Sequence, residues 1–164
     1  MAMNNALVAE LKHEATNTRK ILERVPADQY AWKPHEKSMD LKRIAVHLAD
    51  LPVWVNRVLE IDDLDFAALK YDPAPVNDTK EMLELFDKRI AEAAEMLTNA
   101  TDEKLREKWV LRRGDHIIAE MPRAVAIRNL YMNHSIHHRG QLSVYLRLLD
   151  VPVPGMYGPS ADER

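Results

Sequence analysis

The sequence contains no cysteine, only four glycines and no long apolar run. Without cysteine the chain has no disulfides, no thiolate metal ligands and no cysteine nucleophile, so any metal must be held by histidine, carboxylate or water. No stretch approaches the roughly 18 apolar residues of a membrane span, and the first residues, MAMNNALVAELKHE, have no long apolar core behind a basic start. We therefore expect a cytoplasmic protein without a membrane partner.

Charge of one sign is not concentrated anywhere in the chain. The 23 basic and 26 acidic residues give a formal net charge of −3, and no block of like charge resembles a nucleic-acid-binding tail. The 164 residues, 46% of them hydrophobic, suffice for one sizeable core. The composition therefore predicts a single domain over residues 1–164 and no nucleic-acid partner.

The first half of the chain contains two stretches with helical periodicity. The first runs from about Asn4 to Val25 and is ended by Pro26. The second begins near Ser38, a favourable N-cap residue, and carries apolar residues at alternating steps of three and four. Pro52 interrupts this second stretch because proline lacks the backbone N–H that a helix interior requires. We expect a kink at this proline.

The second half of the chain predicts two further helices. The linker YDPAPVN, residues 71–77, leads to a third helix that is opened by Asp78, with Glu81 in a capping-box relationship. A fourth helix begins with Pro122 in its first turn and extends to about Leu149. The tail that follows is rich in turn formers, so we expect no further helix there.

The stretch WVLRRGDHIIAE, residues 109–120, lies between the third and fourth helices. It predicts two short strands about a turn at Gly114. Its RGD triplet is interpreted as part of that turn and not as a cell-adhesion signal, since disulfides and a signal segment are both lacking. Together these elements predict an all-α fold, a four-helix bundle with a short irregular or hairpin segment before the last long helix.

The fourth predicted helix carries a histidine pair on its apolar face. At about 100° per residue, His134 and His138 fall in the same sector as several apolar residues. Their i, i+4 spacing stacks two imidazoles one turn apart, as in helices that place two histidine nitrogens on one cation. His137 lies at the edge of this sector, so periodicity also permits the i, i+3 pair, although His138 is closer to the centre. In the second helix His47 lies on the apolar seam, with Trp54 two turns further along, and could face the pair across the bundle.

A structural interpretation competes with a metal site. A single histidine on an apolar face is usually a hydrogen-bonded core residue. Three buried imidazoles would need several separate partners, and each missing partner costs on the order of 1–3 kcal/mol, so a shared cation is favoured. His13, His35 and His116 are interpreted as solvated. Arg139 is expected to point away from the histidine pair, toward an acidic helix face or a substrate.

Three stretches of the sequence carry a family resemblance. The segments HHRGQLSVYLR and VPVPGMYGPSADE, together with IAVHLAD around His47, resemble the DinB-like family of metalloenzymes, also called DinB/YfiT-like. The resemblance extends over nearly the whole chain, and its most specific part lies between Asn133 and Ser160. It implies a DinB-like four-helix bundle in which a divalent metal, typically zinc or nickel, is bound by three histidines. These correspond to His47, His134 and His138.

The same resemblance bears on two details of the site. The family pattern HxxxHRGQ selects His138 over His137, whereas Pro52 is not part of the family pattern. Members often form homodimers. Some related proteins are metal-dependent thiol S-transferases or isomerases that use bacillithiol, mycothiol or glutathione.

The resemblance therefore implies a divalent-metal-dependent enzyme, a thiol S-transferase that activates a metal-bound thiol or water. It would act on a small-molecule substrate with a low-molecular-weight thiol as cofactor. Trp54, Tyr131 and Tyr145 are candidates for the substrate pocket, although such residues also serve as ordinary core. The alternative is a noncatalytic metal-binding or small-molecule-binding stress-response protein. No residue is assigned as general acid or base.

Overall fold

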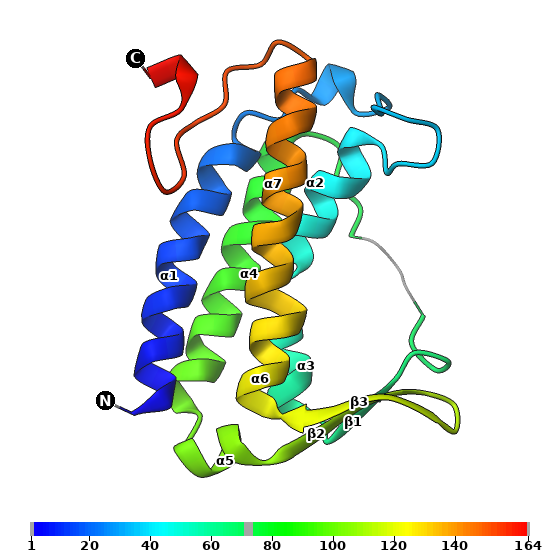
Figure 1. Ribbon diagram of the computed structural model, residues 1–164, viewed down its shortest axis with the longest axis vertical. Coiled ribbons are helices and arrows are strands. Elements are labelled where there is room, and N and C mark those ends of the chain that lie inside the picture. Colours follow the sequence, from blue (N-terminus) through cyan, green and yellow to red (C-terminus); the bar gives the residue numbers. More distant parts are fainter. Residues whose placement is uncertain (1, 71–73, 164) are drawn as a thin grey trace.

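The described part of the chain, residues 2–70 and 74–163 of a computed structural model, forms four rods of helix that run side by side (Figure 1). α1 and α2 each pack against α4 and α7, and α3 packs against α4. These contacts form the predicted helical bundle. Within the described residues, no helix combines the length and the apolarity needed to cross a bilayer. The elements of the bundle are α1 (Met3–Leu22), α2 (Leu41–Asp50) followed by α3 (Val53–Glu60), α4 (Thr79–Asn99), and α6 (Arg123–Ile127) followed by α7 (Asn133–Leu148).

The helix starts follow local sequence signals. α4 begins after Asp78, whose side chain accepts a hydrogen bond of 2.8 Å from the Glu81 backbone N–H, as predicted. The Glu81 carboxylate accepts from the backbone N–H of the residue before Asp78, so the capping box is shifted by one position. α2 is capped by Asp40 and not by the predicted Ser38. Residues 71–73, the first part of the predicted linker, lie outside the described residues.

Pro52 divides the second rod into α2 and α3 at the predicted place. The Leu51 backbone N–H still donates to the His47 carbonyl at 3.0 Å, but Pro52 has no N–H with which to continue the helix. Leu51 and Pro52 keep helical backbone angles, so α3 follows α2 directly after the interruption. The interruption leaves His47 in the last turn of α2.

A three-stranded sheet lies at one end of the bundle, so the fold is mostly helical and not all-α; the prediction included a hairpin segment but not a three-stranded sheet (Figure 1). Its members are β1 (Asp63–Asp65), β2 (Lys108–Arg113), which follows the short helix α5 (Asp102–Arg106), and β3 (His116–Pro122). β2 and β3 form the predicted antiparallel hairpin, with Gly114 in its turn at a φ of +57°. β1 pairs with β2 in parallel. It has only three residues, of which Leu64 alone is buried, so no alternating pattern marked it in the sequence.

Arg123 fixes the start of the last rod to the segment that follows α3. This side chain is 1% exposed. It donates to the Ile61 carbonyl at 2.7 Å and to the Val58 carbonyl, and it forms ion pairs with Asp62 and Glu107. The buried guanidinium is thus surrounded by oxygen acceptors, which offsets the cost of removing its charge from water.

The last rod is not the single α-helix predicted from Pro122 to Leu149. Its segment Arg128–Met132 is π-helical, and the Asn133 backbone N–H bonds to the Arg128 carbonyl five residues earlier. A π-helical turn holds more residues than an α-helical turn, so it changes the rotation between the segments on either side. α7 therefore begins with its own rotational setting, one residue before its first histidine ligand candidate, His134.

Candidate metal centre

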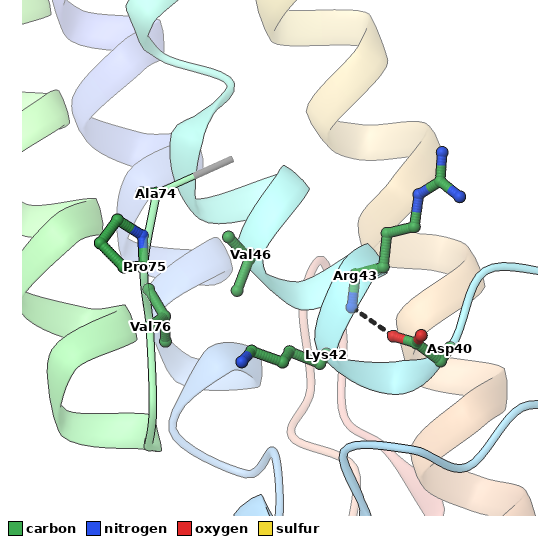
Figure 2. Close-up of a pocket in the computed structure, with 7 residues that line it drawn as sticks. All are labelled: Asp40, Lys42, Arg43, Val46, Ala74, Pro75 and Val76. Carbon is green, nitrogen blue, oxygen red and sulfur yellow. Dashed lines mark hydrogen bonds between the residues drawn. The ribbon is translucent and has the colours of Figure 1, made fainter. Parts of the chain in front are cut away.

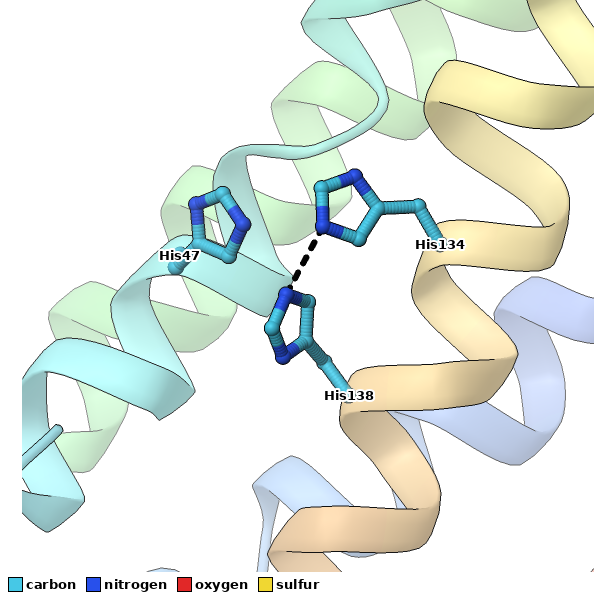
Figure 3. A group of neighbouring side chains, drawn as sticks. All are labelled: His47, His134 and His138. Carbon is cyan, nitrogen blue, oxygen red and sulfur yellow. Dashed lines mark hydrogen bonds between the residues drawn. The ribbon is translucent and has the colours of Figure 1, made fainter. Parts of the chain in front are cut away.

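Three histidine side chains meet between α2 and α7 (Figure 3). His47 comes from the last turn of α2, and His134 and His138 come from successive turns of α7. One ring nitrogen of each histidine lies within 4.8 Å of the others. The ring centroids of the two α7 histidines are 4.6 Å apart, and those of His47 lie 5.2 Å and 4.7 Å from them. The structure brings together the three histidines that the sequence singled out.

The other histidines lie outside this cluster. His137 is exposed, although its ring centroid is 5.0 Å from that of His138. One residue of helical rotation turns it away from α2 and toward solvent. His13, His35 and His116 are exposed as well, as expected for solvated side chains. Of the two pairings that periodicity permitted, the i, i+4 pair is the one that faces α2.

Hydrogen bonds fix which ring nitrogens of the α7 pair are free. His138 Nδ1 lies 2.8 Å from Gln141 Oε1, and the Nε2 atoms of His134 and His138 lie 2.8 Å apart. The second nitrogen of His134 is hydrogen-bonded to the Leu130 backbone. An amide oxygen and a carbonyl oxygen only accept, so each neutral ring has its single hydrogen on Nδ1. The two Nε2 lone pairs then face each other, an arrangement that a cation bound by both would stabilise.

Burial keeps the three imidazoles in the neutral form. It is the main cause that lowers the pKa of His47 to about 4, with smaller contributions from His138, His134 and Arg43. Burial also lowers the pKa values of His134 and His138, although their hydrogen bonds to Leu130 and Gln141 act in the opposite direction. A proton shared between the rings is therefore disfavoured near neutral pH, and neutral imidazole is the form that binds metals. The donor set fits a divalent metal.

A cavity of about 320 Å³ opens beside His47. Its apolar wall includes Trp54 from α3 and Phe66, whose rings pack edge to face with centroids 6.1 Å apart. Its volume is at the lower end of the range typical of small-molecule pockets. The basic side chains that line it come from three separate segments, Arg57, Lys70 and Arg113.

A second hollow, of about 340 Å³, lies between the start of α2 and the segment that leads to α4 (Figure 2). The carboxylate in its wall, Asp40, accepts the Arg43 backbone N–H at 2.7 Å and so serves as the cap of α2. Its lining residues include no histidine: Asp40, Lys42, Arg43, Val46, Ala74, Pro75 and Val76. The cavity beside His47 is therefore the one adjacent to the candidate metal ligands.

The predicted pocket residues lie in different places. Trp54 lines the cavity, whereas Tyr131 is 2% exposed and lies in the core, where burial and the charge of Glu14 raise its pKa. Tyr145 is 8% exposed, and its hydroxyl donates to the Met39 carbonyl at 3.2 Å. Neither tyrosine lines the cavity. Periodicity identifies the inward side of a helix but not which of several neighbours that side contacts.

Arg139 binds an acidic residue on α1, as predicted, but it is buried and not on the surface. It is 2% exposed and forms an ion pair with Glu14, which is 7% exposed. It also donates to Thr18 Oγ1 at 3.0 Å and to the Tyr157 hydroxyl, which in turn donates to the Glu14 carboxylate at 2.7 Å. This network joins α7, α1 and the C-terminal tail.

Several residues at the site were not identified from the sequence. Gln141 follows His138 by three residues on the same side of the helix, and this spacing was the available signal for its hydrogen bond. Arg57, Lys70 and Arg113 have no such signal. They belong to separate segments, and only the fold brings them to one cavity.

Comparison with known proteins identifies a family and two curated relatives. The DinB family model matches residues 1–164. The uncharacterized protein YrdA of Bacillus subtilis strain 168 is 28% identical over 155 residues, which cover 92% of this chain and 85% of the relative. The uncharacterized protein YjoA of the same organism is 27% identical over 151 residues, 90% of this chain and 91% of the relative.

Solved structures support the same fold. The crystal structure of a DinB-like protein, YjoA of Bacillus subtilis, matches with a TM-score of 0.70 at 18% identity, covering 97% of this chain and 99% of that chain. A DinB-like protein from Bacillus cereus ATCC 10987 also matches with a TM-score of 0.70, at 23% identity, covering 89% of this chain and 92% of that chain. At these identities the likeness concerns the fold alone.

Proposed function

This chain belongs to the DinB family, and we propose that it is a divalent-metal-dependent enzyme whose metal ligands are His47, His134 and His138. The main support is the arrangement of two rings: the Nε2 atoms of His134 and His138 lie 2.8 Å apart, while the other nitrogen of each ring makes a hydrogen bond. His47 adds a third nitrogen from the opposite helix. Zinc and nickel suit histidine ligands, and three protein ligands leave a coordination position for substrate or water.

The proposed reaction is thiol S-transfer to a small electrophilic molecule. When bound, a divalent cation supplies Lewis acidity that lowers the pKa of a coordinated water or thiol. The chain has no cysteine of its own, so the nucleophilic sulfur would come from a low-molecular-weight thiol. Gln141 orients the ring of His138 through Nδ1, and Trp54 provides an apolar wall in the cavity that receives the substrate.

Metal content tests the proposed ligands. Untagged protein is incubated with zinc, nickel or manganese, desalted and measured by inductively coupled plasma mass spectrometry. We expect about one metal ion per chain in the wild type, as for a three-histidine site, and its loss in His47→Ala, His134→Ala and His138→Ala. His137→Ala is the matched control because it removes an exposed imidazole beside the cluster. Wild-type protein without metal, or equal loss in the control, contradicts the proposal.

Turnover separates the enzyme from a noncatalytic metal-binding or small-molecule-binding protein. The metal-loaded protein is mixed with glutathione, bacillithiol or mycothiol and a chlorodinitrobenzene electrophile, and thioether formation is followed by absorbance. We expect turnover that disappears after chelation and in His138→Ala. Stoichiometric metal without turnover for any of these thiols favours the noncatalytic alternative.

We also propose that the protein forms a homodimer. Its support is the outer side of α7, where Val144 and Leu148 are 56% and 58% exposed. Large apolar side chains exposed at neighbouring positions provide a surface that a second copy can cover. Such a dimer would leave the histidine cluster on the inner side of the same helix.

A further inference from the structure

The cavity beside the histidine cluster is lined by an excess of positive charge. Three of its side chains, Arg57, Lys70 and Arg113, are cationic, and one, Asp50, is anionic. Asp50 already accepts a hydrogen bond of 2.7 Å from Arg89 Nε, so it does not neutralise the three cations. The chain as a whole has a net charge of −3. The positive charge is therefore a local property of this cavity, of the kind that concentrates anions.

Arg57 is the most informative of these cations. It is partly buried, and its guanidinium carbon lies 5.0 Å from the centroid of the Trp54 ring. Burial lowers its pKa, and the charge of Asp50 offsets this only in part. Within the described residues no oxygen accepts a hydrogen bond from Arg57, whereas Arg123 and Arg139 each contact several oxygens. Stacking on an aromatic ring leaves the N–H edge of a guanidinium available for a carboxylate or a phosphate.

Much of the remaining lining of the cavity is apolar and includes two aromatic rings. Trp54 and Phe66 contact each other edge to face, and aliphatic side chains of Leu51, Val53 and Leu69 continue the surface. The volume of about 320 Å³ restricts the occupant to a small molecule. The positive charge, the small volume and the aromatic rings of the cavity together suit one class of ligand.

We propose that this cavity binds a small organic anion with a flat apolar group, placing its carboxylate or phosphate on Arg57 and its apolar part against Trp54 and Phe66. Lys70 and Arg113 add attraction at the same cavity. His47 is also in the lining, so one end of the bound ligand would lie near this candidate metal ligand. The inference deepens the proposed function and rests on it only for the chemistry at that end.

A set of shape-matched probes tests the anion site. Chelator-treated, metal-free protein labelled with ¹⁵N is titrated with 2-naphthoate, 2-naphthyl phosphate or neutral 2-naphthamide. The Trp54 indole N–H signal, assigned with Trp54→Phe, reports binding. We expect at least one anion to bind about tenfold or more tighter than the amide, because a charge-assisted contact to Arg57 is worth more than a neutral one. The two anions distinguish a carboxylate site from a phosphate site.

Arg57→Gln should remove the preference for the anion and leave amide binding nearly unchanged. The control is Arg24→Gln, which removes an exposed cation from the segment after α1 and should keep the preference. The spectra also report whether each variant is folded. If Arg57→Gln does not fold, the difference in affinity between the anions and the amide in the wild type still tests whether the cavity prefers an anion. Equal affinity for anions and amide, or equal behaviour of the two variants, overturns the proposal.

The outcome is separable from that of the metal experiment. Metal content is measured on the same wild-type and Arg57→Gln samples, in which we expect the same stoichiometry. A stoichiometric metal together with no anion preference refutes the anion site alone. An anion preference that depends on Arg57 in a protein that takes up no metal supports the anion site and refutes the proposed metal-dependent function.

Discussion

The side of α7 that faces α1 and the side that faces α2 each hold a polar cluster that is at least partly buried. On the α1 side, Arg139 donates to the carboxylate and the carbonyl of Glu14, and Tyr157 bonds to both side chains. On the α2 side, the Nε2 atoms of His134 and His138 lie 2.8 Å apart, while both rings make another hydrogen bond, to Leu130 and Gln141. The first cluster is completed by groups of the protein itself, whereas the second has more lone pairs than hydrogens.

This difference distinguishes the two clusters more clearly than the sequence motif does. His138 and Arg139 are neighbours in the same HHRGQ segment, and both are buried. Their positions differ by one residue, or about 100° of rotation, so they face different helices. In the first cluster the charged side chains have partners within the protein, whereas the facing ring nitrogens of the second are groups that a bound cation would satisfy.

The largest expected effect comes from breaking the completed cluster. Arg139→Met leaves the Glu14 carboxylate buried without its cation, and breaking a buried pair in this way costs about 3–5 kcal/mol. Urea unfolding of the metal-free protein measures the loss. Metal content should stay at the wild-type level, because Arg139 faces away from the histidines.

The double variant Glu14→Gln, Arg139→Met provides the control for that prediction. It removes the uncompensated charge, so its free energy of unfolding should lie above that of Arg139→Met alone. A single variant as stable as the wild type, or one that loses its metal while remaining folded, would show that the two clusters are not separate in the way described.

A smaller effect, on metal affinity, is expected from removing a hydrogen-bond partner of the histidine cluster. Gln141→Leu removes the oxygen that accepts the His138 Nδ1 hydrogen bond, and loss of such a partner typically weakens metal affinity by about 10–100-fold. Competition with a chromophoric zinc chelator measures the affinity. Gln29→Leu, at an exposed glutamine in the other half of the chain, is the matched control. Unchanged zinc affinity in Gln141→Leu would mean that Gln141 does not orient the ring.

The smallest effect concerns acid stability without metal. Burial lowers the pKa of His47 to about 4, whereas an unfolded histidine titrates near its ordinary value of 6.5. Between these values the unfolded state binds a proton that the folded state does not, so the metal-free protein loses stability as pH falls below about 6.5. Above that pH the full stability is present.

Urea unfolding at pH 7 and at pH 5 checks this direction. His47→Gln lacks the titrating ring and should lose less stability between the two pH values than the wild type does. The same loss in both proteins would assign the acid sensitivity to other groups. The Arg139 cluster has no histidine, so it should contribute little in this range.

Local signals in the sequence predicted much of the fold. Asp78 capped the third long helix, Pro52 interrupted the second, and Gly114 marked the hairpin turn, because each acts through its own backbone geometry. The spacing of His134 and His138 likewise predicted two rings on one side of a helix. These features depend on residues a few positions apart.

Features that depend on distant segments were not predicted. β1 exists because Asp63–Asp65 lies beside a strand 47 residues later in the chain, and nothing in its three residues indicates a strand. The positive cavity likewise needs Arg57, Lys70 and Arg113 to meet from three segments. Tyr131 and Tyr145 were placed on the inward side of their helix, but the side of the bundle that each would contact could not be predicted from periodicity.

The π-helical segment Arg128–Met132 affects how the last rod would tolerate the deletion of a residue. The turn closed by its i to i+5 hydrogen bond contains one residue more than an α-turn. It lies between Arg123, which is bonded to the end of α3, and the histidines, which face α2. Deleting one residue there would close an ordinary α-turn and leave the relative phase of the two halves nearly unchanged, because the wider turn takes up one extra residue. Arg123 and His134 could then both stay in place, so the last rod should tolerate the loss of one residue in this segment, whereas the same loss from a continuous α-helix would rotate one half by about 100°.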